Sequence, residues 1–328
     1  MTKLVHITDL HFANKPPASR IDDYNETLFK KLEWVVKFAN KKKADALLLG
    51  GDMWHTYQPN IHLFLRFLDI LNGFVNPVYF IWGNHDIQGS NTDHIDRTAF
   101  GFMNRMPFFK NIHKKPVEFD DCTLTGYNYS VKEDCQLHWP WPEKIKTKKM
   151  KVLLTHPMIT RERSIVVDDI YKQVNFKEIT TDADIMLCGH YHGGFTPHEG
   201  EYEGKNFLLA NPGSFGRVNP KEAKESIGPA LTYIQIKGKE SIVDYVKIPT
   251  LKIKDIFDLS ERARKKRKKE NINDFKETLE ELSESNIMGD NFAQALTEVL
   301  EDPPEDLKSY VHNETIQLCK EHIRKHSE

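Results

Sequence analysis

The segment "PVYFIWGNHD" (77–86) joins an apolar run directly to a small polar cluster. Residues 78–82 are all β-branched or aromatic, and such a run ending at a glycine predicts a buried strand followed by a turn. The glycine and asparagine suit that turn. A turn does not require the imidazole of His85 followed by the carboxylate of Asp86. The segment therefore raises the question of whether other strands end in the same way.

Apolar runs of the same kind recur along the chain. They occupy 3–8, 45–51, 77–83, 151–156, 183–190 and 206–211. Apolar residues at helical spacing separate the first three runs, at 28–39 and at Ile61, Leu65 and Leu68. Later strands, with weaker helical patterns or none between them, are expected at 122–129, 228–236 and 241–248. This order predicts an α/β layered domain in which a second sheet packs on the first.

The composition is that of a folded protein without a large net charge. The 328 residues are 39% apolar and 29% charged, and the net charge is −2. Disorder is therefore not expected, and binding to nucleic acid would need a local basic patch. Four cysteines without a CxxC pair favour reduced thiols in a cytosolic protein. No apolar run has the length of a membrane span, and the N-terminus enters a strand without a signal peptide.

The character of the chain changes near residue 250. A stretch rich in Arg and Lys lies within 261–270, and the acidic remainder carries apolar residues at helical spacing. We therefore expect three parts: a domain over 1–250, a basic linker over 251–270 and a helical tail over 271–328.

Five predicted strands end in imidazole, carboxylate or amide side chains. These are Asp9 and His11, Asp52 and His55, Asn84 with His85 and Asp86, His156, and His190 with His192. Ligand sites of open α/β sheets lie beyond the carboxyl ends of the strands, so we expect all five to converge on one edge. One histidine at a strand end is usually a surface or capping residue. Five such ends in this order disfavour a purely structural interpretation.

Two metal ions are the natural use of such a set. The expected ligands form two groups that share a bridging Asp52: Asp9, His11, Asp52 and His192, and Asp52, Asn84, His156 and His190. Mixed oxygen and nitrogen ligands suit Mn²⁺, Fe or Zn²⁺ better than Mg²⁺ or Ca²⁺. Two ions about 3.5–4 Å apart support in-line attack on phosphorus.

His85 is left without a metal in this assignment. It is therefore expected to stabilise developing negative charge or to protonate the leaving oxygen. The neighbouring Asp86 is expected to fix the tautomer of His85.

The order DxH (9–11), GDxxH (51–55), GNHD (83–86), His156 and GHxH (189–192) resembles the calcineurin-like metallophosphoesterase superfamily. That resemblance implies a four-layer αββα sandwich, here with a helical C-terminal appendage. Within the superfamily the chain is most similar to SbcD-type nucleases of double-strand-break repair. The narrower likeness rests on "GDMWHTYQP" (51–59) and "NPGSFGRVN" (211–219).

The SbcD resemblance implies two Mn²⁺ ions and exonuclease and endonuclease activity on DNA. It also implies a homodimer and an SbcC-type coiled-coil ATPase partner, which the C-terminal tail would bind. His55 would position a DNA strand, and His85 would be catalytic. Residues 251–328 are too short and too helical for the capping domain of cellular members, so the chain resembles compact, phage-type members. A cytoplasmic location, in a bacterial cell or a phage-infected host, follows.

Two other functions stay open on the sequence. A stand-alone phosphoesterase for small molecules or phosphoproteins would use the same ligands, and a scaffold with a decayed site is disfavoured by the intact ligand set.

Two minor features of the sequence each allow two interpretations. The basic stretch 262–269 either contacts DNA phosphates or forms a solvent-exposed hinge or helix face. The "HWPWP" segment (138–142) stacks bases through Trp139 and Trp141, or, as we favour, packs on the sheet.

Overall fold

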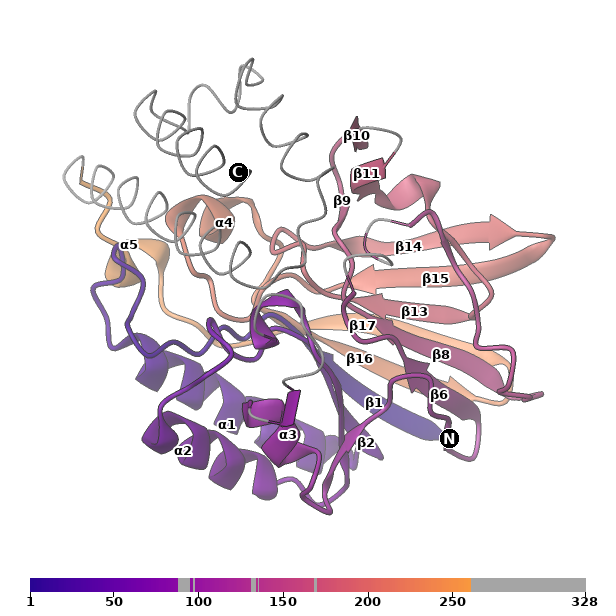
Figure 1. Ribbon diagram of the computed structural model, residues 1–328, viewed down its shortest axis with the longest axis horizontal. Helices are drawn as coiled ribbons and strands as arrows, with labels where there is room; N and C mark the ends of the chain where they lie inside the picture. Colours follow the sequence, from indigo (N-terminus) through magenta and orange to yellow (C-terminus); the bar gives the residue numbers. More distant parts are fainter. Residues whose placement is uncertain (88–94, 97, 131–133, 135, 168–169, 261–328) are drawn as a thin grey trace, which may run out of the picture. The chain divides into compact units, whose positions relative to one another are not determined.

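The computed structural model describes residues 1–87, 95–96, 98–130, 134, 136–167 and 170–260 (Figure 1). The chain divides into two compact units, Met1–Phe257 and Asp258–Glu328. The tail expected over 271–328 and the basic stretch 262–269 lie outside the described residues.

The first sheet has six strands in the order β17-β16-β1-β2-β3-β4. Their bounds are β1 Thr2–Ile7, β2 Ala46–Gly50, β3 Val78–Ile81, β4 Phe109–Asn111, β16 Ala230–Lys237 and β17 Glu240–Lys247. Strands β1 to β4 are parallel to one another. Strand β16 pairs antiparallel with β1, and β17 pairs antiparallel with β16 at the edge of the sheet. Because parallel neighbours need crossover connections, helices cover one face of this sheet.

Those helices are α1 (Tyr24–Lys42), α2 (Ile61–Asn72) and the short α3 (Ala99–Met103), on one side of the sheet in Figure 1. Asp23 caps α1 and Asn60 caps α2 by accepting a hydrogen bond from a backbone N–H of the first turn. The apolar stripe expected over 28–39 is buried. The stripe expected on α2 is only partly correct. Leu68 is buried, but Ile61 and Leu65 are 60% and 48% exposed, and the core face also uses other positions.

The second sheet has the order β14-β15-β13-β8-β6-β5. Its strands are β5 Val117–Glu118, β6 Cys122–Gly126, β8 Met150–Thr155, β13 Ile185–Cys188, β14 Phe195–Tyr202 and β15 Lys205–Asn211. The four central strands β6, β8, β13 and β15 are parallel, and β5 and β14 are antiparallel edges. Two six-stranded sheets therefore form the domain, as expected for the sandwich.

Alternate residues of each central strand point to opposite faces, which produces separate apolar layers. Leu48, Ile81, Val152 and Leu187 belong to the layer between the two sheets. The outer face of the second sheet is covered differently from the helical layer that the αββα pattern predicts. Among the described residues the cover consists of short strands and a 3₁₀ helix: β7 His138–Trp139, β9 Ile159–Thr160, β10 Ile165–Val167, β11 Ile170–Asn175, η4 Phe176–Glu178 and β12 Thr180–Thr181.

Prolines explain why one part of that cover is not helical. Pro140 and Pro142 lie within the segment that follows β7, and proline interrupts a helix because it lacks the N–H donor. Trp139 is buried in the outer layer together with Ile159 and Val174.

The first unit extends beyond the boundary expected at residue 250. The short helices α4 (Pro220–Glu225) and α5 (Ile253–Ile256) meet where Ile256 and Phe257 pack on Ala223. The residues up to Phe257 therefore belong to the folded domain and not to a linker. In the part of the chain that the structure describes, no helix has the length and apolar character needed to cross a membrane.

Candidate metal centre

The predicted ligands follow the carboxyl ends of five parallel strands. Asp9 and His11 follow β1, Asp52 follows β2, Asn84 lies in the 3₁₀ helix η1 (Asn84–Asp86) after β3, His156 follows β8, and His190 and His192 follow β13. Three of these strands belong to the first sheet and two to the second. The structure brings both sets to one site between the sheets.

The first group consists of Asp9, His11 and His192, whose ligand atoms all lie within 4.8 Å of one another. His192 Nε2 is 3.6 Å from Asp9 Oδ1 and 2.9 Å from His11 Nε2. His11 Nε2 is also 3.6 Å from Asp52 Oδ2. Two imidazole nitrogens so close to each other and to two carboxylates form a set that a single cation would satisfy.

The second group consists of Asp52, His156 and His190, again within 4.8 Å. His156 Nε2 is 3.3 Å from Asp52 Oδ2, the same oxygen that approaches His11. This oxygen therefore lies between the two groups. The placement fits the bridging ligand that the sequence predicts.

Three buried ligand atoms are left without a hydrogen bond among the described residues: Asp52 Oδ2, Asn84 Oδ1 and His156 Nε2. A buried polar atom without a partner costs about 1–3 kcal/mol, so such atoms are uncommon unless a ligand satisfies them. All three are metal-ligand types, and together they offer both oxygen and nitrogen donors. The residues present therefore fit divalent cations.

The backbone at the site is strained. Asp9, His11, Asp52 and His190 have φ values of 55°, 53°, 51° and 68°, in the left-handed region that non-glycine residues rarely adopt. Such conformations cost about 1–3 kcal/mol each and concentrate at functional sites. Four strained residues among the predicted ligands indicate that the surrounding fold holds these side chains in place for a ligand.

The glycines beside the candidate ligands have no side chain, and the ligand side chains occupy the space that a Cβ would fill. A Cβ at Gly51 would lie 2.6 Å from His156 Nδ1, and a Cβ at Gly83 would collide with the carboxylate of Asp52. Gly51 also has a φ of 97°. The GD and GN dipeptides of the sequence are thus needed for close packing as well as for turning the chain.

A family model for the calcineurin-like phosphoesterases matches residues 2–194, a range that includes both groups of ligands. The chain belongs to the calcineurin-like phosphoesterase family. This family uses a dinuclear divalent metal site, and the two side-chain groups are its candidate ligands here. The protein is accordingly a metal-dependent hydrolase of phosphoesters.

Three solved structures are similar to this phosphoesterase. A protein of Thermus thermophilus has 14% identity, covers 75% of this chain and 99% of its own, and gives a TM-score of 0.45. A dimetal phosphatase from Danio rerio has 10% identity, coverages of 75% and 97%, and a TM-score of 0.44. An archaeal phosphodiesterase has 13% identity, coverages of 75% and 100%, and a TM-score of 0.36.

Hydrogen bonds fix the orientation of the phosphoesterase ligands. His156 Nδ1 donates to the carbonyl of Gly50 at 2.7 Å, which directs Nε2 at Asp52. The backbone N–H of His190 donates to Asp9 Oδ1 at 3.0 Å, and Thr8 Oγ1 donates to Asp9 Oδ2 at 2.8 Å. A metal-binding imidazole is normally held in this way through its other nitrogen.

Burial and neighbouring charges shift the protonation of the ligands. Burial opposes ionisation of Asp52, but the adjacent His156 and His85 outweigh it and hold the pKa of Asp52 well below its usual value. Burial also opposes the charge on His156, yet Asp52 raises the pKa of His156 to about 10. Desolvation lowers the pKa of His190 to about 3. Ionised Asp52 and neutral His190 are the forms that bind cations, whereas His156 must release a proton before it can bind one.

The role predicted for Asp86 needs correction. Its Oδ2 accepts hydrogen bonds from the backbone N–H groups of Asp52 at 2.7 Å and Gly83 at 2.8 Å, and its Oδ1 accepts one from Trp54 at 3.2 Å. Asp86 therefore holds the loops that carry the ligands and does not orient His85. The imidazole of His85 is held instead by the backbone of His55, whose carbonyl oxygen lies 3.1 Å from His85 Nδ1.

His55 and His85 form an imidazole pair beside the metal ligands. Their rings stack with centroids 5.4 Å apart and an angle of 16° between planes. The ring of His85 also meets His11 edge-on at 5.0 Å. His85 lines a cavity of about 420 Å³ together with Asp52, His190 and His192, so its side chain reaches the space next to the ligands.

The "NPGSFGRVN" segment (211–219) hydrogen-bonds to the backbone of the loop that carries Asp9. Ser214 Oγ and the N–H of Gly216 both donate to the backbone carbonyl of Asp9, at 3.2 and 3.0 Å. Arg217 is only 7% exposed and donates to the carbonyl of Leu251 at 3.2 Å. In the structure this segment thus anchors the strained loop at Asp9.

The other residues that line the 420 Å³ cavity were not predicted from the sequence: Met158, Glu162, Tyr191, Gly193, Asn219 and Lys221. They come from three short stretches of the chain, 158–162, 191–193 and 219–221, which the fold brings together. Two of them carried a signal: Tyr191 stands between the two histidines of the GHxH motif, and Asn219 ends the "NPGSFGRVN" segment.

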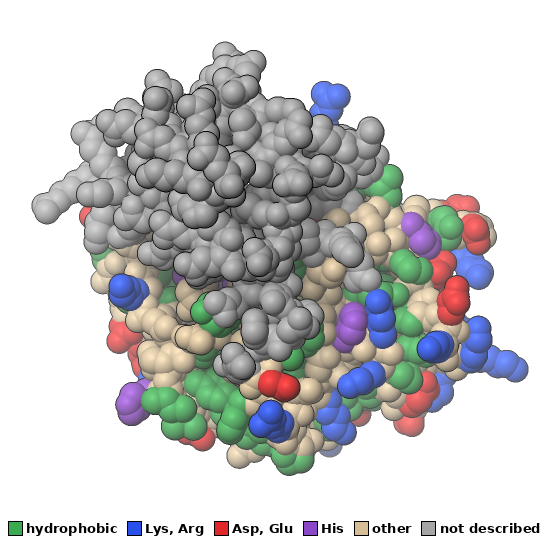
Figure 2. Space-filling view, viewed as in Figure 1, with side chains coloured by type: hydrophobic (Ala, Val, Ile, Leu, Met, Phe, Trp, Pro, Cys, Tyr) green, Lys and Arg blue, Asp and Glu red, His purple; other side chains and the backbone are tan. Residues whose placement is uncertain are grey.

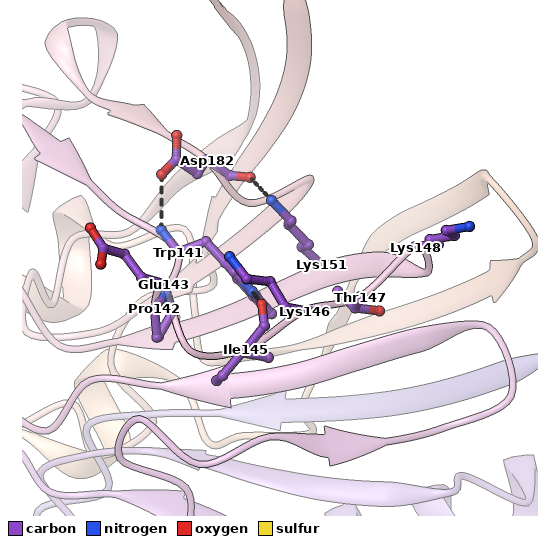
Figure 3. Close-up of a pocket in the computed structure, with 9 residues that line it drawn as sticks. All are labelled: Trp141, Pro142, Glu143, Ile145, Lys146, Thr147, Lys148, Lys151 and Asp182. Carbon is purple, nitrogen blue, oxygen red and sulfur yellow. Dashed lines mark hydrogen bonds between the residues drawn. The ribbon is translucent and has the colours of Figure 1, made fainter.

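A larger cavity, of about 590 Å³, lies away from the metal centre (Figure 3). Lys151, near the start of β8, helps to line it, whereas His156 follows the other end of that strand. Trp141 is 6% exposed and donates from Nε1 to the carbonyl of Ile145 at 3.0 Å. Trp139 and Trp141 are therefore packed residues, which confirms the interpretation favoured from the sequence.

Proposed function

We propose that this phosphoesterase is a DNA nuclease that cleaves phosphodiester bonds with exonuclease and endonuclease activity. Mn²⁺ suits its mixed carboxylate, amide and imidazole ligands. The observation that carries the proposal is the His55–His85 pair next to the metal ligands, with ring centroids 5.4 Å apart. The proposed setting is a repair or recombination complex of SbcD type in a bacterial or phage-infected cytoplasm.

When bound, two divalent cations supply Lewis acidity to a phosphoryl oxygen. The chain's own residues supply the remaining functions. His85 lines the cavity, and its Nδ1 donates to the carbonyl of His55, so its other nitrogen is the one that would transfer a proton. That nitrogen would protonate the leaving oxygen of a cleaved strand. Such proton transfer contributes about 10²–10⁴-fold to a rate.

His55 would position the strand that is cut. It is half-buried and stacks on His85, so a nucleotide that contacts His55 is aligned with the proton donor. A phosphoesterase for small substrates has no strand to align, and this second imidazole is the feature that favours a polymeric substrate. Lys and Arg side chains are interspersed with acidic ones on the face shown in Figure 2, so strand binding would rely on local contacts.

A homodimer is part of the proposal. Ile61, Leu65 and Phe102 are 60%, 48% and 52% exposed, and Phe102 meets the buried Phe64 of α2 edge-on with ring centroids 5.5 Å apart. Apolar side chains gathered on one surface favour association, and a two-fold symmetric partner would cover them. The docking of an SbcC-type coiled-coil ATPase on the tail 271–328 is proposed from the sequence alone, because the tail lies outside the described residues.

The decisive experiment compares substrates. The purified protein with Mn²⁺ is incubated with labelled single- and double-stranded DNA, and in parallel with p-nitrophenyl phosphate and bis-(p-nitrophenyl) phosphate. We expect cleavage of DNA and of the diester, with little hydrolysis of the monoester. Efficient hydrolysis of the monoester or of phosphoproteins without DNA cleavage would instead establish a stand-alone phosphatase.

A further inference from the structure

The 420 Å³ cavity extends beyond the metal ligands to side chains that neither metal binding nor proton transfer uses. Besides Asp52, His85, His190 and His192, it is lined by Met158, Glu162, Tyr191, Gly193, Asn219 and Lys221. Two of these side chains carry opposite charges, Glu162 and Lys221. An unsymmetrical cavity next to a reaction centre selects the parts of the substrate that flank the reacting bond.

One part of the cavity wall is aromatic and acidic. Tyr191 lies between His190 and His192, and a Cβ at Gly193 would lie 2.6 Å from its Cζ, so the ring packs directly over that glycine. The hydroxyl of Tyr191 donates to Glu162 Oε1 and accepts from Arg161 Nε, both at 3.4 Å. The ring is thus held in place beside the metal ligands, with a carboxylate and a guanidinium at its polar end.

Another part of the wall is cationic. Lys221 lies in the first turn of α4, where its ammonium group is exposed. The backbone of α4 is tied to the metal-site loop, because Arg217 Nη2 donates to the carbonyl of Ala223 at 3.4 Å. Lys224, on the same helix, is also exposed but does not line the cavity. Lys221 is therefore the lysine of α4 that can reach a substrate.

We propose that this cavity is a nucleotide subsite next to the scissile bond, in which Tyr191 contacts the nucleoside and Lys221 contacts the neighbouring phosphate. The inference rests on the proposed function and names the substrate part that the site recognises. Glu162 and Arg161 both meet the Tyr191 hydroxyl, so their charges offset each other there and the neutral sugar and base lie on the Tyr191 side. The second phosphate then lies toward Lys221, where charge attraction and a charged hydrogen bond stabilise it.

Inhibition of bis-(p-nitrophenyl) phosphate hydrolysis tests the Lys221 contact without requiring DNA cleavage. The probes are thymidine 3′,5′-bisphosphate, with a second phosphate, and thymidine 5′-monophosphate, without one. We expect the wild type to bind the bisphosphate more tightly. Lys221→Gln should reduce that preference about tenfold, the usual size for a charged hydrogen bond. Lys224→Gln, the matched control, should keep it.

The Tyr191 contact is tested with the same assay. Tyr191→Ala should weaken inhibition by thymidine 3′,5′-bisphosphate about tenfold or more relative to pyrophosphate, because stacking on a base is lost. Tyr191→Phe keeps the ring and should restore most of the nucleoside preference.

Three results would overturn the subsite: no preference for the bisphosphate in the wild type, equal losses for Lys221→Gln and Lys224→Gln, or an unchanged nucleoside preference in Tyr191→Ala. The proposed function is judged separately. A wild type that prefers the bisphosphate but leaves DNA intact would contradict the nuclease and retain the subsite.

Discussion

Asp52 Oδ2 lies 3.3 Å from His156 Nε2 and 3.6 Å from His11 Nε2, so one carboxylate oxygen joins the two halves of the ligand set. His11 follows a strand of the first sheet and His156 a strand of the second. The shared oxygen therefore depends on how the two sheets pack. This position makes Asp52 the residue whose loss should affect both metal ions.

Asp52→Ala should abolish hydrolysis of every phosphoester substrate. Both ligand groups lose a shared anion, and we expect bound Mn²⁺ to fall from about two ions per chain to one or none. Metal content is measured by elemental analysis after gel filtration, and activity with bis-(p-nitrophenyl) phosphate. Asp69→Ala, at an exposed position of α2, is the control. A variant that kept two ions and full activity would refute the bridging assignment.

His85→Ala should keep the metals and lose turnover. His85 lies outside the Asp9–His11–His192 and Asp52–His156–His190 groups, although its ligand atom lies within 4.8 Å of those of His11 and His55. We expect metal content to stay at the wild-type value. The turnover number should drop by about 10²–10⁴, because a positioned proton donor is missing. Metal analysis and steady-state kinetics on the same sample separate the two effects. Loss of metal in this variant would mean that His85 is itself a ligand.

His55→Ala should impair exonuclease action on double-stranded ends more than cleavage of flexible single strands. The substitution removes the imidazole that stacks on His85 but keeps the backbone carbonyl that orients it. Strand alignment is therefore lost while proton transfer remains. Rates on end-labelled duplexes, single strands and bis-(p-nitrophenyl) phosphate are compared. An equal loss on the small diester would contradict a role in strand positioning.

Leu65→Glu should convert a dimer into a monomer without unfolding the chain. Leu65 is 48% exposed on α2, so a charge there costs little in the monomer but is unfavourable in an apolar interface. Sedimentation velocity and thermal unfolding are the measurements. Ile242→Glu is a matched control, since Ile242 is 56% exposed on β17 of the sheet edge. Identical sedimentation of wild type and Leu65→Glu would show that α2 is not the dimer surface.

Asp121 should contribute to stability in a defined pH window. The N–H of Gly238 donates to its carboxylate at 2.8 Å, the amino group of Met1 lies 3.0 Å away, and these contacts lower the pKa of Asp121 from 3.8 to about 2. A depressed pKa means that the stabilisation is complete above 3.8 and is lost as the pH falls toward 2.

The midpoint temperature of thermal unfolding, measured between pH 5 and about pH 2 with chelator present, reports this effect because the range includes both pKa values. Asp121→Asn should unfold at a lower temperature at pH 5 and show a smaller loss on acidification than the wild type. Asp120→Asn, at the exposed neighbouring position, should behave as the wild type. Parallel pH curves for Asp121→Asn and the wild type would argue against the contact.

The strand ends were predictable because a short, local pattern determines them. An apolar run that meets Gly83 or Gly51 is expected to end in a turn, and the polar residues that follow lie at the carboxyl edge of a parallel sheet. The two-sheet architecture followed from the change from strand–helix alternation to strands without helices. Both predictions depend on residues close together in the chain, where periodicity is informative.

The apolar stripe of α2 shows the limit of periodicity. Ile61, Leu65 and Leu68 have helical spacing, yet only Leu68 is buried, because the sheet meets the helix along Leu63, Phe64 and Phe67 as well. The direction from which a helix is covered is set by its neighbours and is not encoded in its own spacing.

The sequence by itself predicted which side chains are the candidate metal ligands and determined in what order the strands present them. Tertiary structure alone decided what holds those side chains. Asp86 was adjacent to His85, but its oxygens bind backbone N–H groups of Asp52 and Gly83, while the carbonyl of His55 orients His85. Hydrogen-bond partners are chosen by distance and direction in space. A neighbour in the chain has no advantage unless the backbone turns it toward the right atom.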